Sequence, residues 1–219
     1  MKKYLLIVCA LLCAGLSFGQ EISNDSVKLI ASSQLKKTET ADRFAKRSEK
    51  SELKLLVSYL KERGYKSLND DKNYFGSESV REFTKTRKKV KSFLYVQDYS
   101  NDKGEYASIG ISGCDGDSAT KPYYFLLFTP ADGKFQNSTE YFVENGKVVL
   151  AHSWGTCLKN NIGGCAATCV VALVSCTGTT AAYLACLAVA CGGCLAWELA
   201  CCSCDCKWWC KGAVGCCDR

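Results

Sequence analysis

The cysteines are the residues of this sequence whose type and spacing most clearly carry chemistry. Of 17 cysteines, Cys9 and Cys13 lie near the N-terminus, Cys114 stands alone mid-chain, and the other 14 crowd into residues 157–217. This density in an exported segment is typical of a disulfide framework. The disulfide candidates are Cys157, Cys165, Cys169, Cys176, Cys186, Cys191, Cys194, Cys201, Cys202, Cys204, Cys206, Cys210, Cys216 and Cys217. Their number permits seven bridges and leaves Cys114 as the odd thiol, with the connectivity open.

Metal binding and catalysis are the competing interpretations of these thiols. Cys191-Gly-Gly-Cys194 and the group Cys202, Cys204, Cys206 and Cys210 resemble thiolate ligand spacings. An oxidising environment and the interleaved Val, Leu and Trp residues favour disulfides instead, so we expect no metal and no cofactor. The single histidine, His152, argues against most histidine-based catalysis. We therefore expect no catalytic residues and no enzyme.

The N-terminus is typical of a secretory signal peptide. Lys2 and Lys3 precede an apolar stretch over residues 4–16, and Ser17 and Gly19 supply small residues before a cut at Gln20. The stretch is short for a membrane span, which needs about 20 apolar residues. The sequence thus predicts export, a secreted or extracellular location, and a mature chain of 200 residues.

The charge balance is modestly basic. The net charge of +6 falls to about +4 when the two leader lysines are removed. This charge density is too low to indicate a nucleic-acid-binding protein, and it mildly favours anionic membrane surfaces. We expect no nucleic-acid partner.

The segment between the leader and residue 155 is expected to hold a polar part and an α+β domain. Residues 20–50 are polar without a sustained period, which favours a spacer or a loosely helical arm. Leu53, Leu56, Val57 and Leu60 share one helical face and predict a helix over 51–63. Ser79 and Glu82 have capping-box spacing and predict a second, shorter helix. Strands follow at 93–98, 105–111, 123–129, 139–143 and 148–152, with Asn145-Gly146 as the clearest hairpin turn.

The resulting fold class is α+β. Helices followed by an antiparallel meander predict a domain over 51–155 in which the helix at 51–63 covers one face of the sheet. A composition break near 153–157 then separates this domain from a small, disulfide-rich, mainly α-helical module at 156–219.

The C-terminal module is expected to consist of three or four short helices. Cys165, Cys169 and Cys176 have helical spacing, and so do Cys191, Cys194 and Cys201. Glycines at 178 and at 192–193 separate the helices. Residues 160–197 carry no charge, so a transmembrane span is an alternative, against which stand the glycine breaks and the many cysteines. A unit this small and rich in alanine buries too little surface to fold without its bridges.

This C-terminal module resembles the halocin-type bacteriocins, which are small cysteine-rich antimicrobial peptides. The resemblance rests on residues 156–217, notably Gly164-Cys165-Ala-Ala-Thr-Cys169, Thr180-Ala-Ala-Tyr-Leu-Ala-Cys186 and Cys191-Gly-Gly-Cys194. It covers under a third of the chain, and the paired cysteines at 201–202 and 216–217 depart from the family pattern. The resemblance implies a secreted precursor whose C-terminal peptide is released and whose N-terminal part serves as an immunity protein.

Two functions are expected from these features. In the first, residues 156–219 form a bacteriocin-like peptide that perturbs a competitor's membrane or meets a membrane receptor, and residues 20–155 are its pro- or immunity region and partner. Indoles favour the membrane interface and lysines favour anionic headgroups, so the membrane-interface candidates are Trp197, Trp208, Trp209, Lys207 and Lys211. In the alternative, the whole chain is a cell-surface or membrane-anchored adhesion or binding protein, with a disulfide-rich or transmembrane tail.

Overall fold

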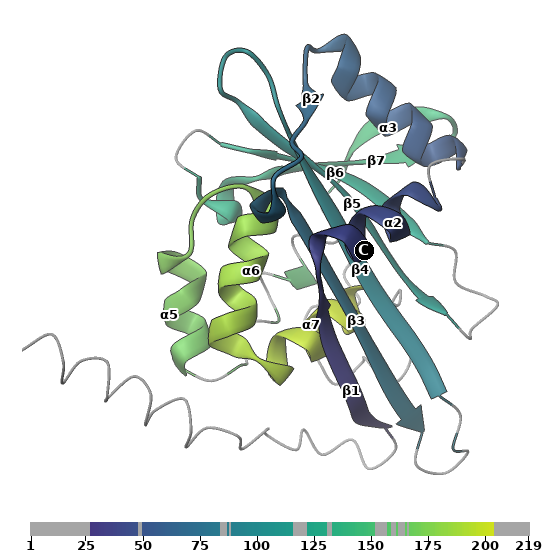
Figure 1. The fold of residues 1–219 in the computed structure, drawn as a ribbon, viewed down its shortest axis with the longest axis vertical. Coiled ribbons are helices and arrows are strands. Elements are labelled where there is room, and N and C mark those ends of the chain that lie inside the picture. The colour runs from purple at the N-terminus through teal and green to yellow at the C-terminus, as the bar shows by residue number, and fades with distance from the viewer. Residues whose placement is uncertain are drawn as a thin grey trace, which may run out of the picture.

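An antiparallel sheet of eight strands forms the centre of the protein in a computed structural model (Figure 1). The structure describes residues 27–47, 50–83, 87, 89–115, 122–130, 133–151, 157, 158, 161, 165 and 167–203. The signal peptide predicted over residues 1–19 and the composition break at 153–156 lie outside the described residues.

The sheet is mostly a meander in which each strand pairs with the next along the chain. Its order is β1-β3-β4-β5-β6-β7-β8, and the short β2 pairs with β4 away from this path. All of these pairings are antiparallel. The strands are β1 (Val27–Leu35), β2 (Lys66–Ser67), β3 (Tyr74–Phe83), β4 (Lys89–Ser100), β5 (Tyr106–Asp115), β6 (Tyr123–Thr129), β7 (Thr139–Glu144) and β8 (Lys147–Ala151).

The central strand β4 buries side chains on both of its faces. Phe93, Tyr95 and Tyr99 belong to one buried cluster, whereas Leu94 and Val96 belong to another. Successive side chains of a strand point to opposite faces of the sheet. The sheet therefore separates two hydrophobic cores, and each core needs its own covering layer.

The first covering layer consists of α2 (Lys37–Ala45) and α3 (Ser51–Glu62). The prediction of a helix over 51–63 is confirmed, and Leu53, Leu56 and Leu60 are fully buried against the aromatic face of the sheet. The helix ends just before Gly64, whose φ of +78° is a conformation that glycine adopts readily.

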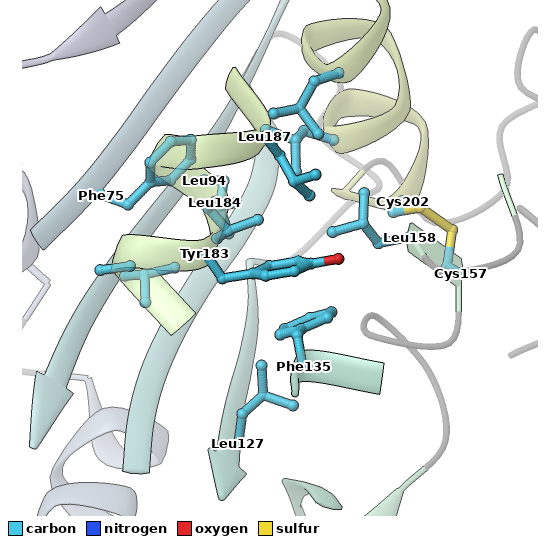
Figure 2. Packing of buried hydrophobic residues seen from close by; sticks show 14 of the residues in the cluster. Phe75, Leu94, Leu127, Phe135, Cys157, Leu158, Tyr183, Leu184, Leu187 and Cys202 are labelled. Carbon is cyan, nitrogen blue, oxygen red and sulfur yellow. A yellow bond between two sulfur atoms is a disulfide. The ribbon is translucent and has the colours of Figure 1, made fainter. Parts of the chain in front are cut away.

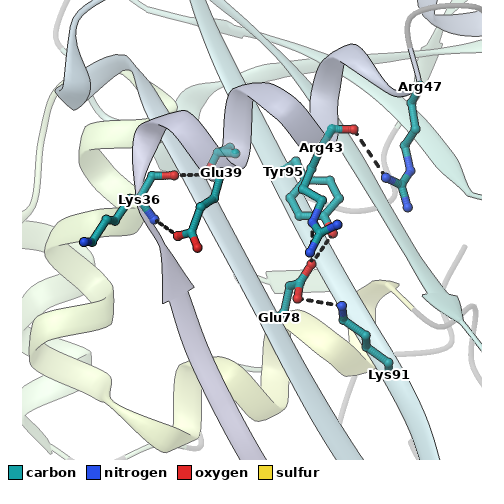
Figure 3. A network of polar contacts seen from close by, with 8 residues as sticks. Lys36, Glu39, Arg43, Arg47, Glu78, Lys91 and Tyr95 are labelled. Carbon is teal, nitrogen blue, oxygen red and sulfur yellow. Dashed lines mark hydrogen bonds and ion pairs between the residues drawn. The ribbon is translucent and has the colours of Figure 1, made fainter.

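An ionic network holds α2 on this face (Figure 3). The Glu78 carboxylate of β3 lies 3.4 Å from Arg43 of α2 and 2.6 Å from Lys91 of β4. It also accepts a 2.6 Å hydrogen bond from the Tyr95 hydroxyl. These partners lower the pKa of Glu78 despite its partial burial. Arg47 completes the contact by stacking over the Phe93 ring, 4.4 Å from the centroid.

The structure of the polar segment at 20–50 corrects one prediction. We expected residues 20–50 to be a spacer or a loosely helical arm, but 27–35 form the edge strand β1 and 37–45 form α2. Strand β1 pairs with β3 from Val27↔Phe83 to Leu35↔Gly76. An edge strand needs backbone partners on one side only and tolerates polar side chains, so its sequence carried no strong strand period.

The predicted helix starting at Ser79 is also wrong, because residues 74–83 form β3. Ser79 does not cap a helix; its hydroxyl lies 2.6 Å from that of Ser92 on β4. Pairing with β1 on one side and β4 on the other satisfies the backbone of β3, and this tertiary context overrides the local capping signal.

Strands β4 to β8 agree with the prediction from the sequence, whereas the short β2 was not predicted. β6 has the predicted bounds, and β4, β5, β7 and β8 differ from theirs by a few residues at their ends. The Asn145-Gly146 turn is confirmed: both residues have positive φ, at +50° and +72°, and the hairpin closes with Glu144 opposite Lys147.

The second covering layer comes from the C-terminal part of the chain. Helices α5 (Ala167–Ser175), α6 (Thr180–Cys191) and α7 (Gly193–Ser203), here called the tail helices, confirm the prediction of several short helices broken at the glycines. Figure 1 shows α5 and α6 side by side, with α7 running on beside β3. Their inner residues share one core with Phe75, Leu94, Val96 and Leu127 of the sheet. The tail helices are thus packed onto the sheet.

The close contact between Gly110 and Phe125 gives a prediction about this second core. These residues lie directly opposite each other on β5 and β6, and a Cβ at position 110 would collide with the Phe125 ring. We expect Gly110→Ala to lower the free energy of unfolding by about 1–3 kcal/mol in urea titration.

Adding Phe125→Leu to Gly110→Ala should cost less than the sum of the two single changes, because the smaller side chain makes room for the new methyl group. Gly193→Ala is the matched control, since a Cβ there meets no atom within 4 Å. Strict additivity in the double variant would contradict the proposed collision.

Candidate functional site

The face of the sheet toward the tail helices carries a row of small residues along β5. Along β5, the buried residues on this face are Ser108, Gly110, Ser112 and Cys114. The larger side chains of the neighbouring strands, such as Leu94 and Leu127, surround them. The Phe125 ring of the neighbouring strand β6 lies over Gly110 in this row.

Large side chains of α6 pack in the core on this face of the sheet. Tyr183, Leu184 and Leu187 are completely buried, and their spacing places them on one side of the helix. The Tyr183 ring stacks on Phe135, with centroids 4.6 Å apart and planes 11° apart (Figure 2). The Tyr183 hydroxyl donates to the carbonyl of Leu173 on the chain of α5, at 3.3 Å. One residue of α6 thus contacts both the sheet layer and the neighbouring helix.

A buried carboxylate joins the sheet to the start of α6. Asp98 of β4 is fully buried; its Oδ1 accepts from the Ser108 hydroxyl at 2.6 Å and from the Ala181 backbone N–H at 3.3 Å. The Thr179 side chain, which caps α6 by accepting from Ala182, also hydrogen-bonds to Asp98. An anion at a helix N-terminus is stabilised by the free N–H groups and the helix dipole.

Burial outweighs these favourable contacts for the protonation of Asp98. Desolvation raises its pKa from 3.8 to about 6, although the hydrogen bonds from Ser108, Thr179 and Ala181 act in the opposite direction. Within the described residues, the second oxygen, Oδ2, has no hydrogen-bond partner. The contact between sheet and tail therefore contains a group that changes charge in mildly acidic solution.

A second buried charge links β3 to α7. Arg81 is 1% exposed, and its Nη2 donates to the Ala196 carbonyl at 3.2 Å. Removal of α7 would take this acceptor away from a guanidinium that stays charged at any physiological pH. Sequence reasoning missed both Asp98 and Arg81. For Asp98, the available signal was its position as the single charged residue in the run 92–100.

Between cysteines that the structure describes, four disulfides join the tail helices to one another and to the segment before them. They are nested: Cys157–Cys202 encloses Cys165–Cys194, which encloses Cys169–Cys191, which encloses Cys176–Cys186. The inner two bridges connect α5, or the residue directly after it, to α6. The helical spacing of the cysteines thus places each set on the side of its helix that meets the other.

The predicted disulfide candidates include all eight cysteines of these bridges. Of the other six, Cys204, Cys206, Cys210, Cys216 and Cys217 lie outside the described residues, and Cys201 lies within α7. The prediction that Cys114 is the odd thiol is wrong, because Cys114 is disulfide-bonded. It lies on the tail-facing side of β5 and is 7% exposed, so it belongs to the core shared with the C-terminal segment.

One group of potential metal ligands occurs among the described residues. The sulfur atoms of Cys165 and Cys194 and a carboxylate oxygen of Glu198 lie within 4.8 Å of one another. Both sulfurs are joined in a disulfide, and the thiolate is the form of cysteine that binds metal. The same holds for Cys191, whose CxxC spacing with Cys194 suggested a ligand pair; it is bridged to Cys169.

The predicted membrane-interface residues are mostly outside the described part of the chain. Trp208, Trp209, Lys207 and Lys211 fall there, and Trp197 lies within α7. His152 is also outside it. Among the described residues, no helix has the length and apolar character needed to cross a membrane.

Exposed valines are the surface feature that sequence reasoning missed. Val170, Val171 and Val174 of α5 and Val189 of α6 are exposed to solvent, at 44%, 62%, 73% and 87%. Their spacing along the helices was visible in the sequence, but it could not show which side of each helix would face the sheet.

Comparison with protein-family models, curated proteins and solved structures found no match for this chain.

The burial of Asp98 predicts a pH dependence of stability. Between about pH 4 and 6 the folded state binds more protons at Asp98 than the unfolded state does, so this group makes stability fall as pH rises through that window. Relative to wild type, Asp98→Asn should gain stability from pH 4.5 to 7, by on the order of 3 kcal/mol at most.

Thermal unfolding followed by circular dichroism at several pH values measures this difference. Asp102→Asn, which removes a carboxylate 89% exposed in the same hairpin, controls for the loss of one charge. A constant difference between Asp98→Asn and wild type across this range would contradict the assignment.

The nested bridges predict an order of stabilities. With the other three bridges intact, the outermost bridge closes only the short segments from Cys157 to Cys165 and from Cys194 to Cys202, and the innermost closes a loop of 10 residues, so chain entropy gives about 3 kcal/mol for each. Cys157→Ala/Cys202→Ala should nevertheless destabilise more than Cys176→Ala/Cys186→Ala in denaturant titration, because both outer cysteines are buried whereas Cys186 is exposed. The pairing itself has a separate test. Peptide mapping without reduction should recover the four nested pairs, and any other pairing of these eight cysteines would refute the nested pattern.

Proposed function

We propose that the protein is a secreted bacteriocin-like precursor in which the sheet domain holds the C-terminal peptide in an inactive, covered form. The peptide corresponds to residues 156–219, and the sheet domain is its pro- or immunity region. The four disulfides fit an oxidising compartment such as the exterior of the cell.

The observation that carries this proposal is the covering of the tail helices by the sheet. Tyr183, Leu184 and Leu187 are the largest apolar side chains of α6, and all three are fully buried in the shared core. A peptide that acts on membranes must expose such residues at its target. A domain that buries them until release would protect the producing cell.

The disulfide pattern supports a tail that can act as a unit of its own. All four nested bridges connect residues between 157 and 202. They would hold the tail helices together after a cut in the segment before Cys157. Without them, short helices made largely of alanine would not persist in water.

The alternative is a surface or extracellular binding protein that stays whole. The core that the tail helices share with the sheet favours it, because release of the tail would expose apolar side chains of both layers to water. Release would also take Asp98 away from the start of α6 and Arg81 away from the Ala196 carbonyl.

Mass spectrometry of the culture supernatant distinguishes the two functions. We expect a fragment that begins near residue 156 and whose mass is reduced by two hydrogens for each bridge. Purified, oxidised peptide 156–219 should inhibit related species and release dye from vesicles at micromolar concentration, whereas reduced and alkylated peptide should not. Intact protein alone in the supernatant, with an inactive peptide, would overturn the precursor function in favour of the alternative.

The role of the sheet domain has its own test. A protease site inserted between Ala151 and Cys157 allows the folded protein to be cut. We expect the two pieces to stay together in gel filtration and to be inactive against the same species. Running the products with and without reductant shows whether the Cys114 bridge also ties them. Full killing activity of the cut but undissociated complex would contradict a protective role.

A further inference from the structure

Cys114 of β5 carries a disulfide that is separate from the four nested bridges. The structure contains a single chain, so the partner of Cys114 is another cysteine of the same chain. A cysteine forms one disulfide at a time, and the eight cysteines of the nested bridges are paired with one another. The partner is therefore one of the other cysteines in the sequence, which are Cys9, Cys13, Cys201, Cys204, Cys206, Cys210, Cys216 and Cys217.

The position of Cys114 in the sheet favours a partner in the C-terminal segment. Cys114 lies opposite Ser92 of β4 in the strand register. Arg81 of β3 donates to the Ser92 hydroxyl at 3.4 Å and to the Ala196 carbonyl of α7 at 3.2 Å. Cys114 also belongs to the core that contains the inner side of α7. This end of β5 therefore lies close to α7.

The candidate partners divide clearly between the two ends of the chain. Cys201 lies within α7, and the other five tail candidates follow the end of that helix at Ser203. A disulfide requires Cα atoms about 4.4–6.8 Å apart, so the partner must come close to β5. Cys9 and Cys13 belong to the predicted signal peptide and would be lost with it. Location and cysteine count thus both favour the tail.

We propose that Cys114 is bridged to a cysteine within residues 201–217, and that this bridge keeps the tail attached to the sheet domain after the chain is cut before Cys157. The inference rests on the proposed precursor function and adds a second step to the release of the peptide. Cys114 is the only cysteine between residues 14 and 156. In the mature chain, no bridge without Cys114 could therefore span the cut.

Such a bridge changes what a cut can achieve. Two pieces held by packing alone separate when a secreted protein is diluted outside the cell. A covalent link instead keeps their effective concentration on the order of millimolar at any dilution. Tyr183, Leu184 and Leu187 would then stay buried against the sheet after the cut. Cutting alone leaves the tail covered, and release needs the Cys114 bridge to be opened.

Thiol–disulfide exchange with a dithiol reductant opens the bridge. One thiolate of the reductant attacks a sulfur of the bridge, and the other cysteine leaves as a thiolate and takes up a proton. The second thiol of the reductant then attacks the mixed disulfide and frees the remaining cysteine. The reductant becomes a disulfide, and two electrons and two protons pass to the cysteine pair. Cys114 is 7% exposed, so a reductant has little access to its sulfur while the core is packed.

Peptide mapping of the full, oxidised chain identifies the partner. Trypsin, applied without reduction after free thiols are blocked, produces peptide 104–134, because Lys121 precedes a proline, and Cys114 is its only cysteine. Cleavage after Lys207 and Lys211 divides the tail candidates among peptides 160–207, 208–211 and 212–219. We expect peptide 104–134 to be linked to one of these three. A blocked, free Cys114, or a link to a second chain or to residues 1–19, would overturn the proposal.

Cutting the chain tests the tether directly. The protein with a protease site inserted between Ala151 and Cys157 is cut, unfolded and run on a denaturing gel without reductant. We expect one species from wild type and two from Cys114→Ser. Dithiothreitol should split the wild-type species into two, and it should do so faster after unfolding than before. Two species from cut, unreduced wild type would refute the tether.

The matched control is Cys157→Ala/Cys202→Ala, which removes a bridge that lies wholly on the tail side of the cut. It should run as one species without reductant. Because the gel reports covalent connection in unfolded protein, a loss of stability in Cys114→Ser does not affect the result. A split of the control without reductant would contradict a link through Cys114.

This outcome is independent of the killing assay. A tether at Cys114 in a protein whose peptide 156–219 kills nothing would retain the covalent link and refute the antimicrobial function. An active peptide that the cut alone sets free would retain the antimicrobial function and refute the second step of release.

Discussion

The fold depends on one constraint, which is that the central sheet is apolar on both faces. Strand β4 places aromatic side chains on one side and aliphatic side chains on the other, and both sets are buried. A sheet with two apolar faces needs two covering layers. The chain supplies the first from the segment that contains α2 and α3, and the second from its tail helices. The cysteine-rich segment is thereby part of the structure of the whole protein.

Two kinds of interaction hold this second layer, and they act at different places. The disulfides join tail residues to each other, and they compensate for helices whose small side chains bury little surface. The buried contacts of Asp98 and Arg81 join the tail to the sheet. Apolar packing alone tolerates shifts of a helix along the sheet, whereas a carboxylate at a helix N-terminus fixes its position.

Much of the fold was predictable wherever local pattern and tertiary role agree. The meander from β4 to β8, the Asn145-Gly146 turn, α3 and the breaks between tail helices follow from period and turn chemistry. Strands β1 and β3 were missed because an edge strand has little apolar period and because Ser79 and Glu82 imitate a helix start. The second covering layer was missed for another reason: an apolar tail is compatible both with a membrane and with the apolar face of a sheet, and its sequence alone does not distinguish the two.

The candidate site shows the same division. The residue type identified the cysteines, but only the side-by-side arrangement of α5 and α6 set their nested pairing. In the sequence of the tail, its valines and leucines are apolar residues of the same kind. Packing on the sheet separates them, because it buries Leu184 and Leu187 and leaves Val174 and Val189 exposed. The sheet therefore does more than cover the tail. It determines which side chains of the tail helices meet solvent, and it buries the larger ones.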